Sequence, residues 1–242
     1  MRLSVWSLEW RIALRRRRLL VLNLGIPLLL VVPIAFSTAP AFHAAAAYAV
    51  LFVLFGVFGS SIPLLREGEE GLLRRMVLTG SPEAPLLVQR LTAGAALDTV
   101  QLLPALTIIL WSGGAPRSVW ALAFLLLPPT LWVTNLLGAW VAAAARSLAE
   151  GALFAAVTGL FLLHGSGVFR TPVEGEFSAL LESMLPFGPM HRVLLAGASG
   201  GPPPPGWAGG LLQPLGFVLV LLTFTWLLAP TLLSRIAPAV RR

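Results

Sequence analysis

Asp98 is the residue with the clearest potential for chemistry, because it is a carboxylate inside an apolar stretch near residues 91–111. An acid inside a membrane-spanning segment is costly, so it normally has a functional or a structural partner. Asp98 can bind a cationic substrate, relay a proton, or form a buried polar contact with Gln101, Asn135 or a second subunit. Together, Asp98, Gln101 and Asn135 make up a predicted intramembrane polar site.

A second candidate is the string HGSG at residues 164–167, which places a histidine two positions from Ser166. A serine nucleophile needs a base within hydrogen-bond reach, usually with an orienting group and an oxyanion hole. The other histidines, His43 and His191, are expected near the outer membrane surface, and no acidic partner is evident within the apolar segments. We therefore predict no catalytic site.

Two further kinds of chemistry find no support in the sequence. The chain has no cysteine, so it has neither a disulfide nor a Cys–His metal site, and we predict no metal and no cofactor. It also lacks the G-x-x-x-x-G-K-(S/T) loop that cradles ATP phosphates. An ATP-driven process would therefore need a separate ATPase chain.

The composition is that of an integral membrane protein. Apolar residues make up 57% of the 242 residues and charged residues only 11%, whereas globular proteins carry about a quarter charged residues. All 17 basic residues are arginine. These arginines flank apolar segments instead of forming a soluble patch, so the net charge of +7 indicates a membrane protein and not a nucleic-acid partner.

The elements that must position these residues are helices that cross a bilayer, whose hydrocarbon core requires about 20 apolar residues. We predict an all-α chain with six spans near residues 19–38, 44–65, 91–111, 119–143, 149–169 and 211–233. Prolines and asparagines in the first and fourth spans indicate packing against protein, because proline leaves carbonyls unpaired. Gly56, Gly59 and Ser60 favour close packing of the second span. Arg146 and Glu150, four positions apart between spans four and five, are expected to pair.

An amphipathic pattern at residues 1–18 predicts a helix lying in the membrane interface. Fourteen of the 17 arginines lie on one side of the bilayer in this scheme, and only Arg117, Arg170 and Arg192 lie on the other. The positive-inside rule then places both chain ends in the cytoplasm. Residues 66–90 are cytoplasmic in the same scheme.

Residues 66–90 contain the only long charged segment that has predicted spans on both sides. Leu72, Leu73 and Met76 share one face of a short helix, which Ser81 and Pro82 end. Such a helix is suited to docking a soluble partner, with the three apolar side chains entering a cleft on it. The alternative is a solvated connecting loop.

The string REGEEGLLRRMVLTGSP at residues 66–82 resembles the segment after the second span of ABC-2 type transporter permeases. In that family the pattern E-x-E-x-G-T-L/E-x-L-L-x-(S/T)-P forms the coupling helix that sits on the ATPase. Here the Thr after the glycine is replaced by Leu72 or is absent. The resemblance assigns ATPase coupling to Glu67, Glu69, Glu70, Gly71, Leu72, Leu73, Arg74, Arg75 and Met76.

The longest external segment, residues 170–210, also resembles this family, which has external helices before its last span. The spacing of apolar residues predicts a short helix at Glu174–Leu185 lying on or dipping into the outer leaflet, and one or two further turns at Met190–Ala196. By resemblance, Ser166, Gly167, Pro186 and Pro189 form the external turn.

The resemblance implies a single ABC-2 type transmembrane domain over residues 1–242. It implies the permease subunit of an ABC exporter in a bacterial or archaeal inner membrane, acting as a homodimer on cytoplasmic ATPase subunits. The expected cavity is lined by spans one, two and five, which favours a hydrophobic, drug-like or lipid-like substrate. Because such permeases take energy from ATP, we favour a structural contact for Asp98.

Two alternatives remain open. A haem-exporter B-type subunit of cytochrome c maturation has a similar size and span number, although it usually lacks so long an external insertion. A membrane scaffold or sensor would use the cytoplasmic helix to bind a partner without transport. The sequence does not identify the substrate or distinguish export from lipid flipping.

Overall fold

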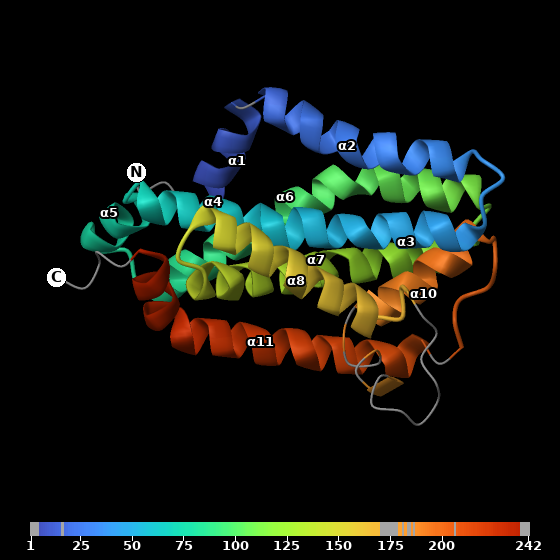
Figure 1. The fold of residues 1–242 in the computed structure, drawn as a ribbon. Coiled ribbons are helices and arrows are strands. Elements are labelled where there is room, and N and C mark those ends of the chain that lie inside the picture. The colour runs from blue at the N-terminus through green and yellow to red at the C-terminus, as the bar shows by residue number, and fades with distance from the viewer. Residues whose placement is uncertain are drawn as a thin grey trace.

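The computed structural model describes residues 5–15, 17–169, 179–180, 182, 185, 187–205 and 207–237. All regular elements in these ranges are helices, as the sequence predicts. Most of them lie side by side along one direction, with α5 at one end of the bundle and α10 at the other (Figure 1). We refer to these as the α5 end and the α10 end.

Among the described residues, five helices are long and apolar enough to cross a membrane, which is typical of a multi-pass helical protein. The first of them, Ala41–Glu69, consists of α3 (Ala41–Phe52), the π-helical segment η1 (Val53–Phe58) and α4 (Gly59–Glu69). The others are α6 (Glu83–Ser112), α7 (Arg117–Ala144), α8 (Leu148–Gly165) and α11 (Trp207–Ile236). They coincide with predicted spans two to six, so five of the six predicted helices are present with the length and hydropathy that a span requires.

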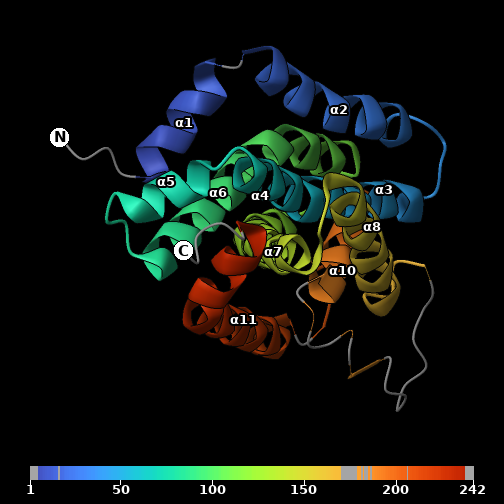
Figure 2. The same ribbon diagram turned by 60° about the vertical axis from the view of Figure 1, so that its left-hand side comes forward.

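The predicted first span corresponds to α2 (Arg17–Ala35), which follows α1 (Val5–Arg15). These helices reach the length and hydropathy of a sixth span only when they are taken together, and they are bent by 78° relative to each other. α1 packs against α6, and α2 lies along α6 and α3 (Figure 2). The predicted amphipathic N-terminal helix is thus present as α1, a separate helix that runs at a steep angle to α2.

α7 is the helix around which the others pack. In its most apolar stretch 61% of the residues are buried, compared with 22% in that of α11. It contacts η1, α4, α6, α10 and α11. Asn135 and Thr134 of α7 are buried, as expected for a proline-containing span that packs against protein. α2 also packs against protein, since Pro27 and Val31 are buried where it contacts α6 and α3, although Val21, Leu22 and Leu29 on its other face are exposed.

Glycine allows α7 to approach the second spanning helix closely. A Cβ atom added at Gly56 would lie 1.7 Å from Thr134 Oγ1, and one added at Gly138 would lie 1.9 Å from Ser60 Oγ. Gly56 and Ser60 therefore serve the predicted close packing. The prediction is wrong for Gly59, whose added Cβ would have only two atoms within 4 Å, the nearer at 3.9 Å.

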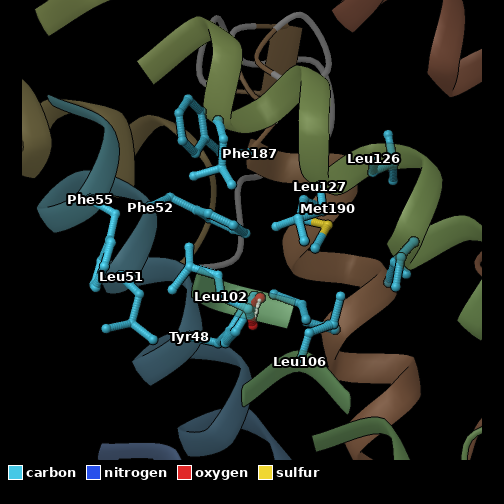
Figure 3. Close-up of a cluster of buried hydrophobic side chains, with 14 of the residues drawn as sticks. Tyr48, Leu51, Phe52, Phe55, Leu102, Leu106, Leu126, Leu127, Phe187 and Met190 are labelled. Carbon is cyan, nitrogen blue, oxygen red and sulfur yellow. Dashed lines mark hydrogen bonds between the residues drawn. The ribbon is translucent and has the colours of Figure 1, made fainter. Parts of the chain in front are cut away.

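α10 (Phe187–Ala198) extends the few turns predicted at Met190–Ala196 into a buried helix of 12 residues. Phe187 and Met190 reach into the core beside Phe52 of α3 and Leu127 of α7 (Figure 3). Gly197 permits this depth, because an added Cβ would lie 2.4 Å from Leu110 Cδ2. Most of the helix predicted at Glu174–Leu185 lies outside the described residues.

The connection between α7 and α8 corrects a predicted ion pair. Glu150 does not bond the Arg146 guanidinium; its Oε2 accepts from the backbone N–H of Arg146 at 2.8 Å, and Ser147 Oγ accepts from the Glu150 N–H at 3.2 Å. This is a capping box, which satisfies N–H groups at the start of α8. The four-residue spacing of Arg146 and Glu150 therefore lets Glu150 stabilise the start of α8 and does not indicate an ion pair.

Candidate functional site

The charged segment at the α5 end folds as a helical elbow. α4 ends at Glu69, and Gly71 takes a φ of 70°, which favours glycine. α5 (Leu72–Leu78) then lies across the end of the bundle (Figure 2). Pro82 is the cap residue of α6, whose first helical residue is Glu83. The short helix predicted in this segment is confirmed.

The outward face of α5 is both basic and apolar. Leu72 and Leu78 are 37% and 67% exposed, and Arg74 and Arg75 are also exposed. Leu78 was not among the predicted site residues, because the predicted apolar face consisted of Leu72, Leu73 and Met76. Glu69 and Glu70 are exposed beside the elbow, where Glu70 bonds Arg66 at 3.0 Å.

Leu73 corrects the predicted apolar docking face, because it is only 1% exposed. It lies in a buried cluster with Leu64 of α4 and Leu87 of α6. Met76 is half-buried. The exposed leucines of α5 are therefore Leu72 and Leu78, whereas Leu73 fastens α5 to the bundle.

Glu67 also points inward, although its motif position suggests an ATPase contact. Its Oε1 accepts a hydrogen bond from Arg90 Nη2 of α6, and Arg90 Nη1 bonds Glu9 Oε1 of α1 at 2.5 Å. The side chains of Arg90, Glu9 and Glu67 are 12%, 15% and 18% exposed. Three helices thus meet at one guanidinium. Sequence reasoning missed this site, although Glu9 is the only acidic residue before Glu67.

A cavity of about 850 Å³ lies beside the elbow. It is formed by the α4–α5 turn, the α7–α8 connection and the end of α11, with Glu69, Arg74 and Arg146 among its lining residues. Gly68 allows α11 to close one side, since an added Cβ would lie 2.2 Å from the Ile236 carbonyl oxygen.

The predicted polar site forms around Asp98. Asn135 Nδ2 donates to Asp98 Oδ2 at 2.8 Å and to the Leu131 carbonyl at 2.9 Å. Gly94 makes room for the amide, because an added Cβ would lie 2.8 Å from Asn135 Oδ1. The predicted contact between Asp98 and Asn135 is confirmed. In the described part of the chain, no hydrogen bond joins Gln101 to either of them.

Asp98, Gln101 and Asn135 all line a second cavity, of about 450 Å³. It lies between α1, α2, η1, α4 and α6, and Asn135 is its lining residue from α7. The expected cavity involved spans one, two and five. This cavity differs, since α6, the third predicted span, supplies a wall and the lining residues include none from α8.

The HGSG string does not form a nucleophile and base. The Ser166 hydroxyl is buried and donates to the Leu162 carbonyl, while His164 is exposed. Gly167 has a φ of 73° in the turn that ends α8. Pro189 is buried in α10, and Pro186 lies outside the described residues. The His, Asp and Glu side chains of the described ranges include no cluster of three that could hold a metal.

Comparison of the chain with protein-family models gives no match, and comparison with curated protein sequences gives none either. Functional inference therefore depends on the elbow, the ion bridge and the Asp98 cavity.

Proposed function

We propose that the chain is the permease subunit of an ATP-driven exporter and that α5 is the helix on which a separate ATPase docks. The observation that carries this proposal is the position and surface of α5. The helix lies across the end of the bundle and exposes Leu72, Leu78, Arg74 and Arg75. Apolar side chains ringed by charges are typical of a docking surface, where charges guide encounter and orientation.

The distribution of arginine supports a cytoplasmic position for α5. Exposed arginines occur around the α5 end of the bundle, at Arg66, Arg74, Arg75, Arg146 and Arg235. Arg117 and Arg192 belong to elements of the α10 end. By the positive-inside rule, the α5 end faces the cytoplasm of a bacterial or archaeal cell and the α10 end faces outward.

Two contacts support transmission of force from α5 into the bundle. Leu73 packs α5 against α4 and α6, so that a push on α5 acts on both spanning helices. Glu67 and Arg90 then link these helices to α1. Closure of the ATPase moves the three helices together and changes access to the cavity that they border.

We further propose that two copies of the chain act together on two ATPase subunits. The substrate is a hydrophobic, drug-like or lipid-like molecule that leaves the cytoplasm or the inner leaflet. The proposal of a pair follows from the resemblance to ABC-2 permeases, and native mass measurement of the purified complex tests it.

Docking is tested with a chain that carries both Leu72→Asp and Leu78→Asp. The chain is co-expressed with ABC ATPase subunits of the same genome, and the complex that forms is purified in nanodiscs. Burial of each leucine contributes roughly 1.5–3 kcal/mol, so the double change should reduce recovery of the ATPase at least tenfold. A control chain with Ser118→Asp and Ser199→Asp adds the same charge at exposed positions of the other end and should recover the ATPase normally.

Full recovery of the ATPase by the Leu72→Asp, Leu78→Asp chain would show that α5 only connects α4 to α6 and is not a docking helix. A wild-type complex whose ATP hydrolysis responds to no hydrophobic compound would instead favour a scaffold or sensor.

A further inference from the structure

The cavity around Asp98 is lined by a carboxyl group that has no cationic partner among the described side chains. Arg90, Gly94, Asp98 and Gln101 line it from one face of α6. Arg90 is occupied by Glu9 and Glu67, and it lies eight residues, about 12 Å along the helix, from Asp98. Within the described ranges, no cationic side chain forms an ion pair with Asp98.

One oxygen of Asp98 is open to the cavity. Asn135 donates to Oδ2 only. Oδ1 lies on the side of Gly59, at 4.0 Å from the position that a Gly59 Cβ would take. Since Gly59 has no side chain and contributes nothing to helix packing, its effect is to leave space in front of this oxygen.

The rest of the cavity suits an apolar body. Ile26 of α2, Leu54 and Phe55 of η1 and Leu97 of α6 line it. Its volume of about 450 Å³ lies within the range of small-molecule sites, which are mostly apolar with a few placed polar groups. The lining residues include two carboxyl groups, Glu9 and Asp98, and one guanidinium, Arg90, which is already paired with Glu9.

We propose that this cavity binds a lipophilic organic cation, whose positive charge lies at Asp98 Oδ1 and whose apolar body lies against Ile26, Leu54, Phe55 and Leu97. A bound cation neutralises a carboxylate that is otherwise costly in an apolar setting. The inference names the substrate class for the proposed exporter and rests on that function for transport, but binding itself requires no ATPase.

The test measures binding of tritiated tetraphenylphosphonium to the full chain in phosphatidylcholine nanodiscs without any ATPase. Nanodiscs without protein correct for partition into lipid, and triphenylphosphine oxide serves as an uncharged competitor with similar aromatic groups. We expect saturable binding of the cation, at least tenfold weaker binding by Asp98→Asn, and no displacement by triphenylphosphine oxide. Wild-type affinity in Asp98→Asn, or displacement by the uncharged compound as effective as that by unlabelled cation, would overturn the proposal.

A second variant decides the question if Asp98→Asn fails to fold. Gly59→Leu fills the space before Oδ1 without changing a charge, and Gly25→Leu is its matched control, because an added Cβ there meets nothing within 4 Å. We expect Gly59→Leu to lose binding and Gly25→Leu to keep it. Equal binding by both variants would refute the site. Because no ATPase is present, this result is independent of the docking experiment.

Discussion

Arg90 Nη1 and Glu9 Oε1 lie 2.5 Å apart, although 81 positions separate the two residues in the sequence. The same guanidinium bonds Glu67 of α4. A short amphipathic helix is thereby fastened to two membrane-spanning helices at the point where it crosses them. This bridge is the structural link between the α5 elbow and the Asp98 cavity, since Glu9 and Arg90 also line that cavity.

Arg90→Gln should lower the free energy of unfolding by about 3–5 kcal/mol, because it leaves two largely buried carboxylates without their cation. The matched control is Glu70→Gln, which breaks the exposed pair with Arg66, whose side chains are 68% and 59% exposed. That change should cost about 0–1 kcal/mol. Denaturant titration in mixed micelles measures both, and similar losses in the two variants would contradict a buried bridge.

Leu72 and Leu73 are neighbours, but replacing each of them by alanine should change the stability of the chain by very different amounts. Leu73→Ala removes a buried side chain and should destabilise the chain by about 2–5 kcal/mol. Leu72→Ala should change stability by no more than about 0.5 kcal/mol, since the residue is exposed. The same denaturant titration decides between them. If Leu72→Ala proved the more destabilising variant, the orientation of α5 would be wrong.

Gly56→Ala should cost about 1–3 kcal/mol, because its Cβ would lie 1.7 Å from Thr134 Oγ1 in a buried helix contact. Gly216→Ala in α11 is the control, since its Cβ would meet nothing within 4 Å. Alanine also favours a helix over glycine by roughly 0.5–1 kcal/mol, so the control should be neutral or slightly stabilising. Comparable stability of both variants would argue against close packing at Gly56.

The proposed orientation is tested with single cysteines in a chain that has none of its own. Thr79 and Ser199 are exposed near opposite ends of the bundle. An impermeant maleimide should label Ser199→Cys in intact cells and Thr79→Cys only after permeabilisation. Labelling of Thr79→Cys from outside would show that the orientation is the reverse of the proposed one. α5 would then be out of reach of a cytoplasmic ATPase.

His191 in α10 should make stability depend on pH. Its burial, and to a lesser degree the neighbouring Arg192, hold the pKa of the imidazole below its usual value, so the folded state binds the proton less readily than the unfolded state. Stability should therefore fall as pH decreases from 7 to 5, through the unfolded pKa of about 6.5. Unfolding of His191→Gln should show a smaller loss over this window. An unchanged pH profile in His191→Gln would contradict the assignment.

The sequence by itself determined the helices and their class. Long apolar runs are local signals, and they placed α6, α7, α8 and α11 close to their observed positions. Pro82 marked the end of the α5 segment, because proline restricts the backbone locally. The turn at Gly71, where φ is 70°, was not predicted. Asn135 was one of three partners considered for Asp98, along with Gln101 and a second subunit, and the structure shows the contact with Asn135.

Only the tertiary structure decided which way the site residues face. Glu67 and Glu69 are two positions apart, yet one pairs with Arg90 and the other is exposed. Leu73 turned inward because α4 and α6 offer it an apolar cluster, and α10 became a core helix because Gly197 can approach Leu110. Periodicity shows that a helix has two faces. Which face is buried depends on neighbours that are distant in sequence, and their positions are set by packing of the whole bundle.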